Sequence, residues 1–142
     1  TKVFNYEVDD QSSTLMELEN GAYAYVDANF NIPDAAAMCR LEFYGTRGSM
    51  MAEGTLSQVE GGSLKVLLSD EAGYDAQQNR NDVEPMEVNV EFGNMYTKEI
   101  ESFGRSILDG QAIEVPASDA IYVQRVMYAA YESAEKRQFI DL

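Results

Sequence analysis

The chain has 142 residues, 45% of them hydrophobic, and this length is typical of one domain that buries a core of its own. Its formal net charge of −15 argues against nucleic acid and anionic lipid as partners, since both are bound by clusters of Lys or Arg. It contains no histidine, which excludes the zinc centres and catalytic triads that depend on imidazole. Any catalysis would rest on Asp, Glu, Lys, Tyr or Cys.

Cysteine content and hydropathy predict a cytoplasmic protein. No apolar run approaches the roughly 20 residues that cross a bilayer, so no membrane association is expected. The single Cys39 excludes an internal disulfide and fits a reducing compartment. Because Cys39 follows the apolar Met38 and no histidine can activate it, we expect a small buried hydrophobe rather than a nucleophile.

Alternating apolar and polar residues predict strands from the N-terminus onward. Residues 2–9 form the first, with Phe4, Tyr6 and Val8 on its apolar face. Residues 14–19 and 22–30 flank Asn20-Gly21, which predicts a hairpin with a type I′ turn, because that turn needs positive φ at both central residues.

Further strands are predicted in the middle of the chain, at residues 38–44, 49–53, 64–69 and 86–92. The segment Gly45-Thr46-Arg47-Gly48 suggests a phosphate loop, but it lacks the Gly-Lys-Ser/Thr ending and has strand patterns on both sides, which favours a plain turn. Residues 70–85 are acidic and lack aliphatic periodicity, so they read as a long solvated loop. A calcium site or a lid over a ligand at the sheet edge are the alternatives for this loop.

The last third of the chain predicts two amphipathic helices. Apolar residues recur three and four apart on each: Ile100, Phe103, Ile107 and Leu108 on the first, Val123, Met127, Ala130 and Ala134 on the second. Gly110 ends the first helix, and Ser118 is the expected N-cap of the second. Residues 139–142 predict a short closing strand. Strands first and helices last indicate an α+β fold, with a largely antiparallel sheet of about six strands and both C-terminal helices packed on one face.

The opposite face of this sheet is predicted to be open for dimerisation. Tyr23 and Tyr25 alternate with the small residues of their strand, and Arg40, Glu42 and Tyr44 alternate with Leu41 and Phe43. An aromatic patch on the open side of a sheet is typical of an interface. The candidate dimer-interface residues are Tyr23, Tyr25, Arg40, Glu42 and Tyr44, with a set of isolated half-buried tyrosines as the alternative.

Several motifs, in this order, resemble the C-terminal domain of the glucose-fructose oxidoreductase, inositol dehydrogenase and rhizopine catabolism (Gfo/Idh/MocA) family. They are Glu19-Asn20-Gly21-Ala22, the segment from Leu41 to Met50 around Gly45-Thr46-Arg47-Gly48, the helix from Tyr96 to Phe103 with Ile107-Leu108-Asp109-Gly110, Ser118-Asp119-Ala120, and Tyr131-Glu132-Ser133-Ala134. The resemblance covers nearly the whole chain.

The resemblance implies a role within a larger enzyme. Family members are NAD(P)-dependent sugar and polyol oxidoreductases whose N-terminal Rossmann domain carries the dinucleotide loop and a Glu-Lys-Pro segment with a catalytic lysine. Neither is present here, since Glu135-Lys136-Arg137 lacks the proline. A family Asp-x-x-x-His element would lie before Thr1. The resemblance further implies that the open sheet face meets a second subunit and that the sheet edge walls the substrate pocket.

The sequence therefore predicts that residues 1–142 are a single C-terminal domain of a two-domain oxidoreductase, with the Rossmann domain absent. No catalytic, cofactor-binding or metal-binding residue is assigned, and the domain alone is expected to be inactive. NAD or NADP, and a small sugar- or polyol-like substrate, belong to the intact parent; the expected partner is a second copy. The main alternative is a stand-alone non-enzymatic binding or assembly module, and an acidic metal-binding regulator ranks last.

Overall fold

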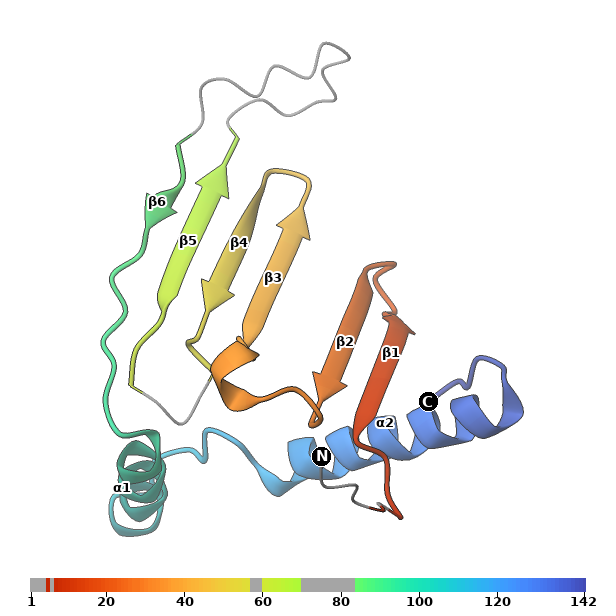
Figure 1. Cartoon of the computed structure of the whole chain (residues 1–142). Coiled ribbons are helices and arrows are strands. Elements are labelled where there is room, and N and C mark those ends of the chain that lie inside the picture. The colour runs from red at the N-terminus through yellow and green to blue at the C-terminus, as the bar shows by residue number, and fades with distance from the viewer. Residues whose placement is uncertain (1–4, 6, 57–59, 70–83) are drawn as a thin grey trace. The chain divides into compact units, whose positions relative to one another are not determined.

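The computed structural model describes residues 5, 7–56, 60–69 and 84–142. In these ranges six strands are followed by two helices, which confirms the predicted α+β class (Figure 1). All strand pairs are antiparallel, but they form two sheets, β1–β2 and β3–β4–β5–β6, rather than one. The chain divides into two compact units, Thr1–Pro33 with Ser106–Leu142, and Asp34–Arg105.

The first sheet is the hairpin of β1 (Gln11–Glu17) and β2 (Tyr23–Asn29), which confirms the predicted hairpin. The predicted type I′ turn is wrong. Gly21 has φ of 81° but Asn20 has no positive φ, and the Leu18 carbonyl accepts a hydrogen bond of 2.8 Å from the Gly21 N–H. Leu18 and Ala22 therefore close a three-residue loop, in which only the last residue needs the left-handed conformation that glycine adopts at little cost.

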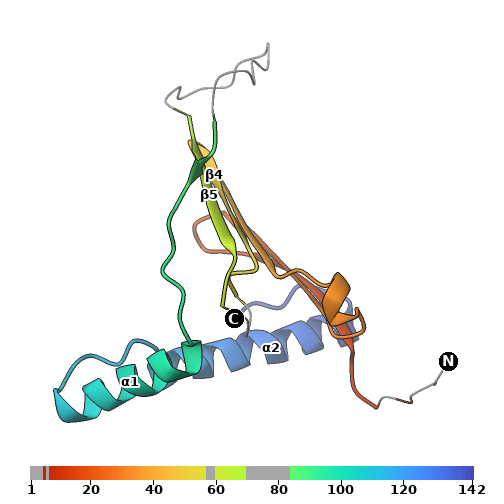
Figure 2. The same ribbon diagram turned by 60° about the vertical axis from the view of Figure 1, so that its left-hand side comes forward.

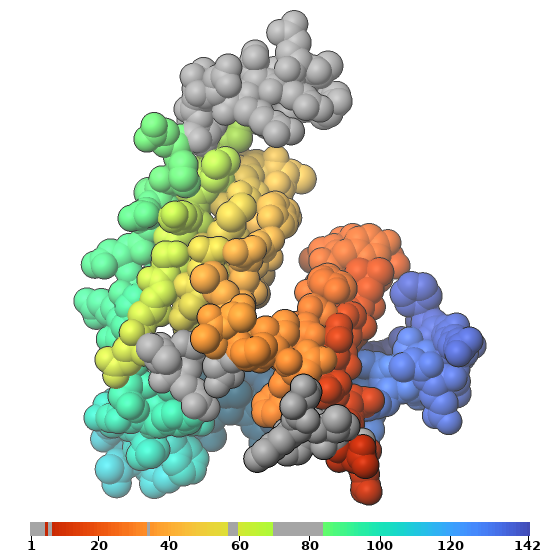
Figure 3. Space-filling view, in the orientation of Figure 1, coloured from red at the N-terminus to blue at the C-terminus, as the bar shows by residue number. Residues whose placement is uncertain are grey.

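The second sheet contains β3 (Arg40–Gly45), β4 (Gly48–Glu53), β5 (Ser63–Leu68) and the two-residue β6 (Met86–Glu87). The short helix η1 (Asp34–Ala36) precedes it. Figure 2 shows the sheet nearly edge-on, and in the space-filling view its central strands form one continuous surface (Figure 3). Thr46 and Arg47 form the tip of the β3–β4 hairpin, so the plain-turn interpretation of residues 45–48 is confirmed.

One face of the four-stranded sheet is entirely apolar. The pairing register places these side chains on it: Leu41, Phe43, Met50, Ala52, Leu64, Val66, Leu68 and Met86. We call this set the apolar face. Ala52, near its centre, is 8% exposed and is the one buried hydrophobic residue among those that the structure describes.

Three predicted strands differ in the structure. Of residues 2–9, only 5 and 7–9 are described, and they are irregular, with Val8 exposed. The strand predicted at 86–92 is paired only at Met86–Glu87, after which one further bond joins the Val88 N–H to the Leu64 carbonyl at 2.9 Å. Residues 139–142 form no strand, and none of the described strands pairs with them. The predicted acidic loop lies outside the described residues, apart from 84–85.

Cys39 is exposed, so the prediction of a buried hydrophobe is wrong. It lies immediately before β3, where its carbonyl accepts a hydrogen bond of 2.8 Å from the Gly54 N–H. This bond holds the backbone at the end of the sheet, just beyond its paired residues. Neighbouring strands therefore do not cover the Cys39 side chain.

The two predicted helices are α1 (Met95–Leu108) and α2 (Ala117–Lys136). Asn94 caps α1, since its Oδ1 accepts a hydrogen bond of 3.0 Å from the Thr97 N–H. Gly110, with φ of 66°, follows the end of α1 as predicted. Ser118 is not the N-cap of α2. Pro116 holds that position without a side-chain cap, because its side chain has no oxygen, and its carbonyl accepts a hydrogen bond of 3.0 Å from the Asp119 N–H. Neither helix, nor any other in the described ranges, is long and apolar enough to span a bilayer.

We expect Asn94→Ala to destabilise the protein by about 1 kcal/mol, because the Thr97 N–H would lose its acceptor at the start of α1. Ser118→Ala is the matched control, since the Ser118 side chain caps no helix, and it should change stability by less than about 0.5 kcal/mol. Urea unfolding followed by circular dichroism measures both. Equal losses for the two variants would contradict the assignment of the cap.

Candidate interface on the four-stranded sheet

The face of the sheet opposite the apolar face carries charged and aromatic side chains. The register places these residues together on it: Arg40, Glu42, Tyr44, Ser49, Met51, Glu53, Ser63, Lys65, Leu67 and Glu87. We call this set the polar face. It contains three of the five predicted interface residues, Arg40, Glu42 and Tyr44, and the structure confirms that they lie on one side of β3.

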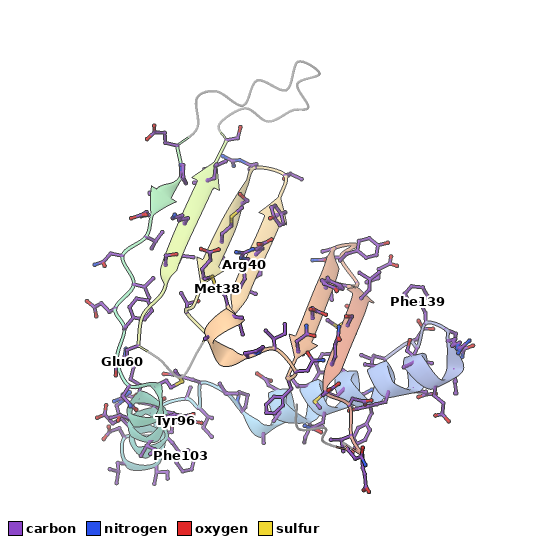
Figure 4. The ribbon with its side chains drawn as sticks, viewed as in Figure 1. Met38, Arg40, Glu60, Tyr96, Phe103 and Phe139 are labelled. Carbon is purple, nitrogen blue, oxygen red and sulfur yellow. The ribbon has the colours of Figure 1, made fainter. Side chains whose placement is uncertain are left out.

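Arg40 joins two carboxylates on neighbouring strands. Its Nη2 lies 2.8 Å from Glu53 Oε1 on β4, and its Nε lies 3.6 Å from Glu42 Oε1 on its own strand. Figure 4 labels Arg40. The three side chains are 35–54% exposed, so solvent screens both ion pairs. One guanidinium thus holds two carboxylates in fixed positions on a surface that water still reaches.

Tyr44 extends this network along β3. Its hydroxyl donates a hydrogen bond of 2.8 Å to Glu42 Oε2, since the two residues lie on the same face two positions apart. This hydrogen bond to Glu42, together with desolvation and the charge of Glu42, raises the pKa of Tyr44 above 10.0, and Arg40 opposes the shift. The phenol therefore stays protonated and acts as a donor at neutral pH.

Ionisation of Tyr44 should destabilise the fold at alkaline pH. Since the pKa in the folded state is raised above the unfolded value of 10.0, the contribution is fully present below that pH and is lost as the pH rises through the raised value. We expect Glu42→Gln to lower the pKa of Tyr44. The difference between the ultraviolet tyrosinate titrations of each background and its Tyr44→Phe derivative isolates this one phenol. An unchanged Tyr44 titration in Glu42→Gln would contradict the role of the Glu42 carboxylate.

The remaining part of the polar face lies on β4, β5 and β6. Lys65 Nζ is 3.9 Å from Glu87 Oε1, so these two residues form an ion pair on β5 and β6, away from Arg40. Between the two charged groups lie Met51, 40% exposed, and Leu67. Sequence reasoning missed these residues. The residues on β4 were predictable from the sequence, because a turn centred on Thr46 and Arg47 places Glu53 opposite Arg40 and Met51 opposite Glu42.

Tyr23 and Tyr25 lie on the other unit of the chain. They share one face of the β1–β2 hairpin, each 66% exposed, and pair with Glu17 and Leu15. On the same face the Ser13 hydroxyl donates a hydrogen bond of 2.6 Å to Asp27 Oδ1. The five predicted residues therefore form two groups, one on each unit, and every one of them is exposed.

An open hollow runs beside the edge of the four-stranded sheet. It is lined by Gly62, Ser63, Leu64, Glu87, Val88, Asn89, Val90 and Phe92. Backbone groups, one carboxylate and one amide meet apolar side chains there, which is the mixture that binds small polar ligands. The hollow lies at the β6 edge of this sheet, and the family resemblance did not say which edge walls the substrate pocket.

The family described as "Oxidoreductase family, C-terminal alpha/beta domain" (GFO_IDH_MocA_C) matches residues 2–142. The chain belongs to this family. This chain is 25% identical over 135 residues to "D-xylose 1-dehydrogenase (NADP(+)) 2" of Haloferax volcanii. The alignment covers 95% of this domain and 37% of that relative, so the chain spans little more than a third of the relative's length. No solved structure matches the domain.

Proposed function

We propose that this chain is the C-terminal domain of an NAD(P)-dependent oxidoreductase that acts on a sugar or polyol in the cytoplasm. The observation that carries the proposal is the family match over residues 2–142. The similarity to a D-xylose dehydrogenase that uses NADP⁺ supports the substrate class and the cofactor class. In this proposal the domain contributes subunit pairing and one wall of the substrate pocket, and the nucleotide binds elsewhere in the protein.

The segment Gly45-Thr46-Arg47-Gly48 does not fit a dinucleotide. A pyrophosphate is held by a glycine-rich loop that follows a strand and opens a helix. Gly45 and Gly48 instead flank the tip of a hairpin between two antiparallel strands. This segment is therefore given no cofactor-binding role, and in this proposal hydride transfer requires a nucleotide-binding domain outside residues 1–142.

The polar face is the proposed contact with a second copy. Its two cations, Arg40 and Lys65, and its three carboxylates alternate across the sheet around Met51 and Leu67. Both signs of charge around apolar side chains support pairing with a second copy, since an interface about a two-fold axis brings the same patch of both subunits together. The hollow beside β5 and β6 is the proposed pocket wall, where the side chain of Asn89, which lies outside the polar face, supplies groups that hydrogen-bond hydroxyls.

Activity of the full-length protein tests the proposal. We expect the product of the complete gene to reduce NADP⁺ or NAD⁺ with D-xylose or a related sugar or polyol, measured by the absorbance of the reduced nicotinamide. Residues 1–142 alone should show no turnover. A complete gene that encodes no nucleotide-binding domain would refute the proposal and support a stand-alone binding module.

A further inference from the structure

The charge of the chain is strongly unbalanced. There are 25 Asp and Glu residues against 10 Lys and Arg residues, and the isoelectric point is about 4.1. Because histidine is absent, no side chain becomes cationic when the pH falls from neutral to about 6. The excess of negative charge is therefore a constant property of the chain at physiological pH.

Ion pairs cannot remove this excess, because 15 carboxylates would remain even if each of the 10 cations neutralised one. In the described ranges four cations pair with carboxylates: Arg40 with Glu42 and Glu53, Lys65 with Glu87, Arg105 with Glu101, and Lys136 with Glu132. Both partners of every pair are at least 35% exposed. Each such pair contributes little to stability, so few favourable contacts are lost when salt screens them.

Other carboxylates lie on the surface outside the ion pairs of the described residues. Four exposed examples on separate segments are Glu19, Glu99, Glu114 and Glu135, and none forms an ion pair with a residue that the structure describes. Folding brings such groups closer together than they are in the unfolded chain. Their mutual repulsion therefore opposes the folded state.

Dissolved salt decides how strong this repulsion is. The screening length is about 10 Å at 0.1 M salt and about 3 Å at 1 M. At the lower concentration carboxylates on neighbouring elements repel one another, and at the higher one they interact only with immediate neighbours. The net charge of −15 makes the repulsion between carboxylates strong, whereas each exposed ion pair contributes little attraction. Screening of the repulsion therefore dominates the response to salt.

We propose that this domain is adapted to fold in molar salt, where dissolved cations screen its uncompensated carboxylates. The free energy of opening its secondary structure increases with ionic strength over the whole range up to molar concentrations. The adaptation resides in the distributed excess of Asp and Glu, and no specific ion site is involved. It is independent of the reaction that the protein catalyses.

Hydrogen–deuterium exchange of the full-length protein tests this inference peptide by peptide. We expect protection of peptides from β3–β5 and α2 to increase at least about tenfold between about 0.1 M and about 2 M KCl, relative to an unstructured peptide in the same buffers. Potassium sulfate at the same ionic strength should give a similar increase. Protection that is constant or falls in KCl, or that increases in sulfate alone, would overturn the proposal, because sulfate also strengthens hydrophobic burial.

A charge variant separates screening from other effects of salt. Glu19, Glu99, Glu114 and Glu135 changed together to Gln should raise protection in low salt and reduce the increase on adding KCl. The same four positions changed to Asp keep every charge and should retain the full salt dependence. Equal salt dependence in the Gln and Asp variants would refute the role of these carboxylates.

Discussion

Replacement of Gly48 by Ala is expected to destabilise the protein by about 3 kcal/mol or more, the largest loss that we predict for a single added methyl group. Gly48 begins β4 with φ of 155° and pairs with both Gly45 of β3 and Leu68 of β5. A Cβ at this position would lie 2.1 Å from the carbonyl oxygen of Leu67. Backbone atoms of a paired strand cannot move away without breaking the β4–β5 ladder, so the sheet must distort.

Gly21→Ala is the matched control for this prediction. Gly21 has φ of 81°, but no atom lies within 4 Å of the position that its Cβ would take. Its substitution should cost only the strain of a left-handed alanine, about 1 kcal/mol. Urea unfolding followed by circular dichroism compares the two variants. A loss for Gly48→Ala no greater than that for Gly21→Ala would show that the contact with Leu67 does not matter.

Hydrophobic periodicity predicted the strands and helices that have a clear pattern of apolar residues and a turn residue where the pattern stops. The strands β1 to β5 and both helices lie within a few residues of the predicted ranges, because Gly21, the turn at Thr46-Arg47 and Gly110 stop each pattern where the backbone needs to turn. Residues 86–92 also alternate, yet they pair only at Met86–Glu87. Alternation records which side chains suit a half-buried surface, whereas strand pairing also needs a neighbour at the right distance.

Local hydrogen bonding was harder to predict than periodicity. Ser118 has the right side chain for an N-cap, but Pro116 already sets an extended backbone before the helix and Ser118 falls inside it. Asn94 was overlooked, although it stands three residues before Thr97, the spacing at which an Asn side chain caps a helix. The hydrogen bond between Leu18 and Ala22 closes a three-residue loop. This loop is longer than the two-residue turn that Asn20-Gly21 alone predicts.

The sequence predicted the candidate interface along one strand but not across the neighbouring strands of the sheet. Alternation along β3 placed Arg40, Glu42 and Tyr44 on one face, since a strand has a period of two residues. It could not identify Met51, Lys65 and Glu87 as their neighbours, because these lie on other strands and depend on the pairing register. The composition of an interface therefore follows from the register of the sheet, whose strands are joined by one tight hairpin, β3–β4, and two longer connections.

Introduction of a charge at Met51 is expected to abolish pairing of two copies through the polar face. Met51 lies on the central strand β4, is 40% exposed, and stands opposite Glu42 on β3 and Lys65 on β5. In the proposed dimer it is buried, and Met51→Asp would bury a fourth carboxylate on a face whose two cations already pair with three, in a protein that carries a charge of −15. Dissociation should become at least about 100-fold more favourable, or about 3 kcal/mol, as measured by sedimentation equilibrium of the full-length protein.

Two further variants separate the effect of charge from effects on folding. Met51→Leu keeps an apolar side chain of similar volume and should change the dissociation constant by less than about tenfold. Met51→Asn removes the apolar contact without adding charge, so its effect should lie between those of Leu and Asp. The circular dichroism spectra of all three should match that of the unchanged protein, because a half-exposed side chain on a sheet contributes little to the fold itself. A monomeric unchanged protein, or a dimer that tolerates Met51→Asp, would exclude this face as the contact and leave the Tyr23 and Tyr25 face of the hairpin as the alternative.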